Sequence, residues 1–252
     1  MNMEQRREKM VELVNREGSV SFAQLKQFFR PVSDMTVRRD LEYLDKQKRI
    51  IRTHGGARSV EVLAGTDDLY LRRSTRNAEG KRVIARKAVQ LLQYNTAIFL
   101  DSGSTCTEFA RLIPDGPYMI FTTSVNSALE LSRLSQAQVY VIGGRLNAAS
   151  FCVNGAATLQ QLETINFQTV FLGTMGFSQG RGFTCGSEED CAVKRAAIRQ
   201  GEKVVMLMDA QKVEVTGTFT FAETGDINVL VTDTDLPERT ARFFERNNVE
   251  VV

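Results

Sequence analysis

The first sixty residues alternate apolar stripes with single breaking residues, a pattern typical of a small helical domain. Over residues 3–17 the apolar positions fall on one helical stripe, which Gly18 ends. Ser21 is followed three residues later by Gln24, a capping-box pattern that predicts a short second helix ending near Phe29. Two helices are therefore expected before Pro31, which breaks the second one.

A third helix is predicted over residues 34–48, with Ser33 as its N-cap and apolar residues recurring along one face. After it, the apolar residues within 50–52 and the Gly55–Gly56 turn predict a small β-hairpin, or wing. Three helices followed by a wing make a winged helix-turn-helix domain, of class α+β. The sequence therefore predicts such a head over residues 1–58.

From Thr96 onward the rhythm changes to short apolar runs that alternate with helical segments. Continuous apolar runs are expected for strands buried on both faces of a parallel sheet. This pattern predicts an open, mostly parallel α/β domain. A polar linker over 59–75 and a basic amphipathic helix over 76–93 precede the first run, so the second domain is placed at 76–252. The predicted strands are 97–100, 118–121, 139–142, 169–172, 204–208 and 229–231.

Charge is distributed unevenly between these two parts. The chain of 252 residues has a formal net charge of +2, but residues 1–58 hold thirteen Lys and Arg against eight Asp and Glu. A basic head on a mildly acidic body fits a head that contacts nucleic acid. No apolar run approaches the ~20 residues of a membrane helix, and no signal-peptide core is present, so we expect a cytoplasmic protein that is not bound to membranes.

Metal and cofactor chemistry is not expected. None of the four cysteines forms a C-x-x-C pair, and the chain has one histidine, His54. Structural zinc sites need several closely spaced Cys and His ligands. Reduced, buried thiols are the expectation for a cytosolic chain.

The third helix carries the residues expected to meet double-stranded DNA. Its adjacent Arg38 and Arg39 are suited to this role, because the planar guanidinium fork can bond guanine O6 and N7 together. Basic residues of the wing are expected on backbone phosphates, which set register and not sequence. The predicted DNA-binding residues are Ser33, Met35, Thr36, Arg38, Arg39, Arg52, His54 and Arg58.

In the second domain, the segment Asp101–Glu108 follows a predicted strand and opens a helix. A loop of small residues at the carboxyl end of a parallel strand presents backbone N–H groups beside a helix N-terminus, which favours phosphate. Thr122–Ser124 and Gly143–Arg145 follow the next two strands in the same way. Three such loops on one sheet edge predict a single ligand site, although ordinary turn and cap chemistry also uses these residues.

Charged residues further along the chain join this prediction. The segment Gly186–Asp190 opens another helix, in which Glu189 is placed to bond sugar hydroxyls and Lys194 to reach a phosphate. Asp209 and Lys212 follow a later strand, again at a carboxyl end. Helix-dipole pairing and a plain surface loop are the alternative interpretations of these residues.

Several of these segments together resemble the DeoR family of bacterial transcriptional regulators. The resemblance runs through the segments Val32–Leu41, Ile50–Ala57, Asp101–Thr105, Thr122–Ser124, Gly143–Gly144 and Asp209 with Lys212. It implies a winged-helix head and a sensor domain like the ribose-phosphate isomerases. It also implies a homo-oligomer, dimer or tetramer, that represses a sugar operon and leaves operator DNA when a phosphorylated sugar binds.

Carried over by position, the resemblance extends the expected effector site. The predicted effector-binding residues are Asp101, Ser102, Gly103, Ser104, Thr105, Thr123, Gly143, Gly144, Glu189, Lys194 and Lys212. Two departures from the family pattern are visible. The turn Phe29–Pro31 is one residue longer than in many members, and the D-H-S-K-F usual in the family is here Asp209–Val213, without the His and Ser. Two alternatives remain: an activator with the same architecture, and a sugar-phosphate isomerase or transferase with Asp101, Glu189 or Asp209 as acid or base.

Overall fold

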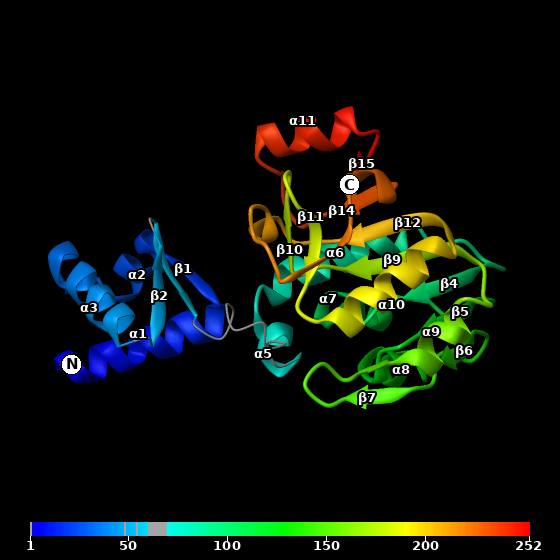
Figure 1. Ribbon diagram of the computed structural model, residues 1–252, viewed down its shortest axis with the longest axis horizontal. Helices are drawn as coiled ribbons and strands as arrows, with labels where there is room; N and C mark the ends of the chain where they lie inside the picture. The colour runs from blue at the N-terminus through cyan, green and yellow to red at the C-terminus, as the bar shows by residue number, and fades with distance from the viewer. Residues whose placement is uncertain (1, 48, 54, 60–69) are drawn as a thin grey trace. The chain divides into compact units, whose positions relative to one another are not determined.

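The computed structural model (Figure 1) divides the chain into two compact units, residues 1–68 and 69–252, called here the head and the body. His54 and residues 60–69 of the predicted linker lie outside the described residues. Among the helices described, none is long and apolar enough to cross a membrane. The structure describes residues 2–47, 49–53, 55–59 and 70–252.

The head has the predicted helices and wing, and the expected winged helix-turn-helix is confirmed. Ser21 and Gln24 form the predicted capping box, and Ser33 accepts from Thr36 N. The buried faces of the three helices meet in one apolar core that includes Met10, Leu25 and Leu44. The elements are α1 Met3–Glu17, β1 Ser19–Ser21, α2 Phe22–Phe28, α3 Asp34–Lys46, β2 Ile50–Thr53 and β3 Gly56–Ser59.

One strand of the head was not predicted. β1 pairs antiparallel with β3, so the wing is a three-stranded sheet of order β1-β3-β2. Gly56 lies opposite Ser21, and an added Cβ on Gly56 would come within 2.0 Å of Val20 O. The Gly55–Gly56 pair therefore lets the wing backbone approach β1 closely.

The body is built on a seven-stranded sheet of order β15-β14-β12-β9-β4-β5-β6. All its strand pairs are parallel, so the predicted open α/β sheet is confirmed. Each predicted apolar run falls in one strand, with ends shifted by up to three residues. The strands are β4 Ala97–Leu100, β5 Met119–Thr122, β6 Gln138–Val141, β9 Phe167–Gly173, β12 Gly201–Leu207, β14 Val229–Val231 and β15 Glu250–Val251.

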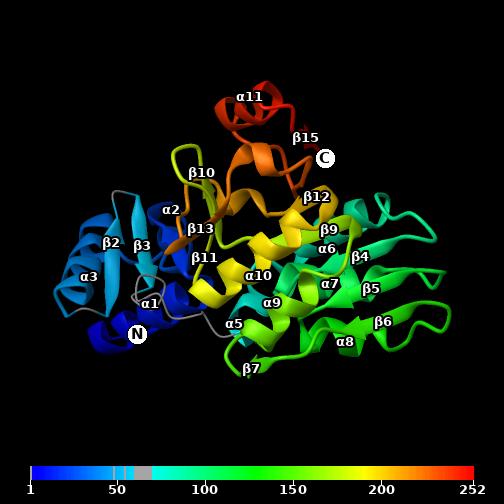
Figure 2. The ribbon, with the colours of Figure 1, turned by 45° about the vertical axis from the view of Figure 1, so that its right-hand side comes forward.

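Helices cover both faces of this sheet, with α9 and α10 on one face and α6, α7 and α8 on the other (Figure 2). Alternate residues of each central strand enter the two separate cores: Phe99 packs in the first and Ile98 in the second. Burial on both faces explains why the strands read as continuous apolar runs. The helices are α6 Ala78–Val89, α7 Ser104–Leu112, α8 Val125–Leu131, α9 Ala156–Leu162, α10 Glu188–Arg199 and α11 Glu238–Arg246.

Part of the predicted linker is helical. Residues 70–75, assigned to the linker from their mixed polarity, form helix α5 (Tyr70–Thr75) of the body. Tyr70 is buried, its ring meets Phe151 edge-on at 6.0 Å, and its N–H donates to Ala149 O. This tertiary contact has no counterpart in the local pattern, which is why the sequence did not indicate it.

Two small antiparallel sheets were also not predicted. One has order β10-β11-β13, and the other pairs β7 with β8. Their strands are only three or four residues long, too short for an alternating pattern to mark them. The strands are β7 Arg145–Asn147, β8 Cys152–Asn154, β10 Gly176–Ser178, β11 Gly182–Cys185 and β13 Phe219–Ala222.

Candidate functional site

Helix α3 presents a clearly two-sided surface. Val37, Leu41 and Leu44 are buried in the head core, whereas Arg38 and Arg39 lie on the exposed side with Met35, which is 59% exposed. The exposed side thus carries two guanidinium groups and a flexible apolar side chain. Base edges and thymine methyl groups are recognised by these side-chain types.

The two arginines differ in their surroundings. The Arg38 guanidinium lies over the ring of Phe22, 4.4 Å from its centroid, so α2 holds it in place. Among the described residues no ion pair or ring contact of this kind is found for Arg39. Arg38 is therefore the preorganised one of the pair.

Asp40, next to these arginines, is a structural residue that sequence reasoning missed. Its carboxylate is 2% exposed and accepts from Arg6 Nε at 2.6 Å and from Arg7 Nε at 2.8 Å. Arg7 also stacks on Tyr43, 3.7 Å from the ring centroid. Asp40 thus fastens α3 to α1, and its charge is neutralised before α3 meets any partner.

The remaining predicted DNA contacts lie around α3 and the wing. Ser33 Oγ accepts from Thr36 N and is also hydrogen-bonded to the Thr36 hydroxyl at 2.9 Å. Ser33 therefore caps α3, and its hydroxyl is already engaged within the helix. Arg52 is exposed on β2 and Arg58 is half-buried on β3. His54 lies outside the described residues.

In the body, all strands of the parallel sheet have their carboxyl ends on the same side. At β4 the direction in which successive strands are added to the sheet reverses. From β4 the chain continues outward to β5 and β6, whereas β9 lies on the opposite side of β4. Ligands of open α/β sheets bind at such a topological switch point. Asp101 follows β4 and Gly173 ends β9, so both lie there, and the Gly173 N–H donates to Asp101 Oδ2 at 2.9 Å.

A buried ion pair occupies this switch point. Lys194 of α10 bonds Asp101 Oδ2, donates to Gly173 O at 3.1 Å and lies 3.7 Å from Asp190 Oδ2. Burial opposes the charge on Lys194, but the carboxylates of Asp101 and Asp190 outweigh it and raise the pKa of Lys194. The other carboxylate oxygen, Asp101 Oδ1, is buried and has no hydrogen-bond partner among the described residues. Asp101 Oδ1 is therefore a buried acceptor that the described part of the chain leaves unused.

The loop after Asp101 leads directly into the N-terminus of helix α7. Gly103, the N-cap of α7, has φ +112° and ψ 161°, a conformation that is essentially restricted to glycine. Within the described part of the chain, an added Cβ on Gly103 would meet nothing within 4 Å, and no side chain caps the helix. The first N–H groups of α7 are therefore left for an external anion.

Lys81 of α6 is a second residue that sequence reasoning missed. It is 4% exposed, and its ammonium donates to the carbonyls of Arg73 and Arg76. Ser104 Oγ donates to the same Arg73 carbonyl at 3.1 Å, which places Lys81 beside the first turn of α7. Burial, followed by the charge of Lys212, lowers the pKa of Lys81 to about 8.

Lys212 belongs to the same neighbourhood. It lies in the short helix η1 (Ala210–Lys212), 3.3 Å from the buried carboxylate of Asp209. Burial raises the pKa of the Cys106 thiol in α7, and the charges of Asp101, Lys194 and Lys212 all act on it. The structure thus gathers Asp101, the 102–105 loop, Lys194 and Lys212 at one edge of the sheet.

The other predicted effector residues have different surroundings. Thr123 is buried and its carbonyl accepts from Val153 N. The Gly143 N–H, expected to face a ligand, instead donates to Gln161 Oε1 at 3.1 Å, and Gly144 would clash with Thr158 if it had a Cβ.

Glu189, which was also predicted to bind the effector, lies on the protein surface. It is exposed at the start of α10 and pairs with Arg145 at 3.2 Å. The residues that we propose as effector contacts therefore do not include Thr123, Gly143, Gly144 or Glu189.

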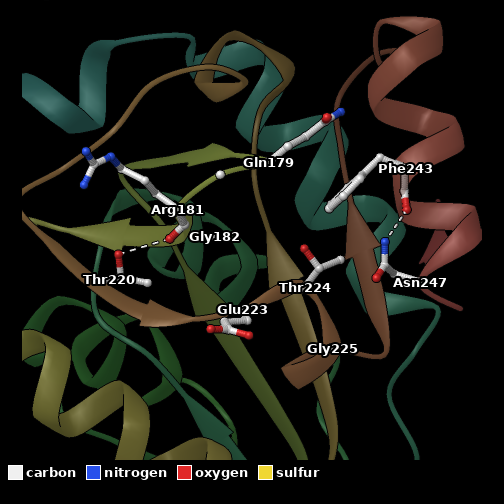
Figure 3. A pocket seen from close by; sticks show the side chains of 10 residues that line it. Gln179, Arg181, Gly182, Thr220, Glu223, Thr224, Gly225, Phe243 and Asn247 are labelled. Atoms are coloured by element: carbon white, nitrogen blue, oxygen red, sulfur yellow. Dashed lines mark hydrogen bonds between the residues drawn. The ribbon is translucent and has the colours of Figure 1, made fainter.

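A separate pocket of about 520 Å³ lies between the β10–β11 turn, the end of β13 and α11 (Figure 3). Two of its polar side chains are bonded to neighbouring backbone: Thr220 Oγ1 donates to Arg181 O, and Asn247 Nδ2 donates to Phe243 O. None of the predicted effector residues lines this pocket.

Comparison with known proteins agrees with this two-part architecture. A family model of the DeoR-like helix-turn-helix domain matches residues 6–62, and a model of the DeoR C terminal sensor domain matches residues 76–234. The chain belongs to the DeoR family of transcriptional regulators. This regulator is 32% identical over 249 residues to the HTH-type transcriptional regulator GlpR of Haloferax volcanii, covering 98% of this chain and 96% of that one.

Two further relatives are named for opposite effects on transcription. The HTH-type transcriptional repressor GlcR of Bacillus subtilis is 31% identical over 221 residues, covering 88% of this regulator and 85% of GlcR. The L-fucose operon activator of Haemophilus influenzae is 30% identical over 253 residues, covering 99% and 100%. Both repressors and activators therefore occur among its relatives.

Similarity to solved structures concerns the fold alone. The regulator resembles eIF2B beta from Chaetomium thermophilum with a TM-score of 0.55 at 10% identity, covering 98% of this chain and 93% of that one. A ribose 5-phosphate isomerase A from Methanocaldococcus jannaschii matches 54% of the regulator and 55% of that chain, with 16% identity and a TM-score of 0.41.

Proposed function

We propose that this regulator represses a sugar or sugar-derivative operon and is released from its operator by a phosphorylated sugar. The observation that supports it most concerns three features that lie at the carboxyl ends of the central strands. They are a helix N-terminus that no described side chain caps, buried Lys81, and a carboxylate oxygen without a partner among the described residues. A phosphate and a hydroxyl in one molecule match these features. The name of the L-fucose operon activator points to the same chemical class of pathway.

The proposed binding mode assigns each half of the ligand to named groups. The phosphate accepts from the N–H groups at 103–105 and from the hydroxyl of Ser102, with Lys81 and Lys212 supplying charge. A sugar hydroxyl donates to Asp101 Oδ1. Lys194 holds Asp101 in place through its other oxygen, so the acceptor is fixed before the ligand arrives.

The head is proposed to act as one half of a dimer, or of a pair within a tetramer. Two copies of α3 then enter successive major grooves about 34 Å apart. Phosphate contacts supply much of the affinity, so binding weakens steeply with salt. The effector shifts the regulator toward a DNA-incompetent arrangement by no more than its differential affinity for the two states.

The segment around α6 is proposed to connect the two functions. Lys81 lies in α6, and its ammonium binds the carbonyls of Arg73 and Arg76, at the end of α5 and just after it. This stretch is the part of the body nearest in sequence to the head. An anion that draws Lys81 toward α7 therefore acts directly on the segment that leads to the DNA-binding unit.

The proposal is tested by screening phosphorylated sugars against the full-length protein. We expect one of them to raise the thermal unfolding temperature and to release operator DNA in a gel-shift assay, while its unphosphorylated sugar does neither. Chemical turnover of that sugar phosphate would instead favour the isomerase or transferase alternative. Stimulated transcription from the same promoter would favour the activator role that the fucose relative carries.

A further inference from the structure

Strand β6 forms one outer edge of the seven-stranded sheet, and no described strand pairs with its outer side (Figure 2). Gln138 N donates to Tyr118 O and Ile142 N donates to Thr122 O, so these amides point inward to β5. Since backbone groups alternate along a strand, the N–H and C=O groups of Val139 and Val141 point outward. An exposed strand edge of this kind is a template for another strand.

This edge lacks the protection that proteins commonly give to exposed strands. From Leu134 to Gly144 the chain carries no charged residue and no proline, although a quarter of all its residues are charged. Tyr140 and Val141 are 43% and 53% exposed. The opposite edge differs, because β15 is two residues long and carries Glu250. Charged, very short strands are a usual means of preventing edge pairing, and β6 has neither property.

We propose that β6 pairs antiparallel with β6 of a second copy of this chain, around a two-fold axis at Tyr140. The β6 pairing rests on the proposed self-association of the regulator, and it identifies the surface through which two copies associate. In that register Val139 faces Val141 of the second copy, and each pair exchanges both backbone hydrogen bonds. Tyr140 faces Tyr140 of the second copy, side chain beside side chain.

A second copy fits this edge better than an unrelated strand, because the edge is complementary to itself. A two-fold axis brings the residue at its centre against its own copy, so a charge there would meet a like charge; the edge has none. The Tyr140 ring is already fixed by stacking on Phe121, 4.6 Å away and inclined by 10°. Exposed Met119 on β5, the neighbouring strand, adds apolar surface beside the short strand pair.

A cysteine placed on the axis tests the register directly. Opposed residues of a non-hydrogen-bonded antiparallel pair have Cα atoms about 4.5 Å apart, within disulfide range. Tyr140→Cys is therefore expected to form a covalent dimer under mild oxidation. The matched control is Gln138→Cys on the same strand, whose copies would lie ~13 Å apart and cannot bridge. The native cysteines are all buried and do not interfere.

Charge variants test whether the pair sustains the oligomer. Tyr140→Asp and Tyr140→Lys should each raise the dissociation constant by at least about tenfold, and mixing the two variants should restore association, as light scattering reports. A monomeric wild type would refute self-association altogether. An oligomer of unchanged mass in both variants, or a disulfide through Gln138→Cys and not Tyr140→Cys, would refute this surface and leave DNA binding and effector sensing untouched.

Discussion

Gly103 offers the sharpest test of the effector site, because its replacement acts through the backbone and not through a clash. At φ +112° and ψ 161° it occupies a region that costs a residue with a Cβ about 1–3 kcal/mol. No atom lies within 4 Å of an added Cβ. Gly103→Ala must therefore either retain this strain or relieve it by rotating the amide groups that we propose to bind phosphate.

Gly155 provides a control with the same local geometry. It is the N-cap of α9, with φ +106° and ψ 179°, open space at its Cβ and no side-chain cap. Gly155→Ala should carry a similar strain outside the proposed contact set. For a body of this size either variant should lower the unfolding temperature by about 2–12 °C, measured by differential scanning calorimetry.

The two variants should differ in their response to effector. Losing one hydrogen bond to a charged group costs about 1.5–3 kcal/mol, which weakens effector binding about 10- to 150-fold. We expect this loss in Gly103→Ala, by calorimetric titration with the identified sugar phosphate, and near-normal affinity in Gly155→Ala. Operator binding without effector should be unchanged in both. The proposed site is refuted if Gly103→Ala keeps wild-type effector affinity, or if both variants lose it equally.

Three further predictions concern the head and Lys81. Arg38→Ala and Arg39→Ala should each weaken operator binding by about 1–3 kcal/mol in gel-shift assays; undiminished affinity in both contradicts the proposed role of α3. Asp40→Ala should lower the free energy of unfolding of the head by about 3 kcal/mol, because two guanidinium groups lose their partner; chemical denaturation that leaves the head transition unmoved would rule this out. Because the pKa of Lys81 is about 8, the charged form dominates below that pH, and effector affinity should fall as pH rises from 7 to 9. Calorimetry in two buffers should show proton uptake near pH 8, and Lys81→Met should abolish it.

Local rules were enough to predict most of the fold. The Ser21 capping box and the strand at 97–100 follow from spacing and apolar runs alone, and both are present at the predicted positions. What the sequence did not indicate depends on distant partners. β1 is three residues long and forms against the wing some forty residues later, and α5 depends on the contact between Tyr70 and Phe151.

Individual residues of the candidate site could be predicted from the sequence, but the contacts between them could not. Asp101 and Lys194 were each expected near the effector from strand-end and helix-start patterns, but 93 positions separate them and their ion pair is visible only in the fold. Lys81 escaped notice because a lysine in an amphipathic helix is usually on the solvated face. Its ammonium bonds carbonyls in α5 and just after it, an element that the sequence did not indicate either.

The ion pairs within the head reduce the charge that DNA encounters. Of the thirteen basic residues in 1–58, Arg6 and Arg7 bind Asp40, Lys26 binds Asp34, and Arg49 binds Glu8. Counting lysines and arginines therefore overstates the number of counterions released on association. If each of two heads used the two helix arginines and the two wing arginines, the plot of log affinity against log salt would have a slope no steeper than about −7. A slope of this size means that a moderate increase in salt concentration should weaken sequence-independent DNA binding without abolishing specific binding.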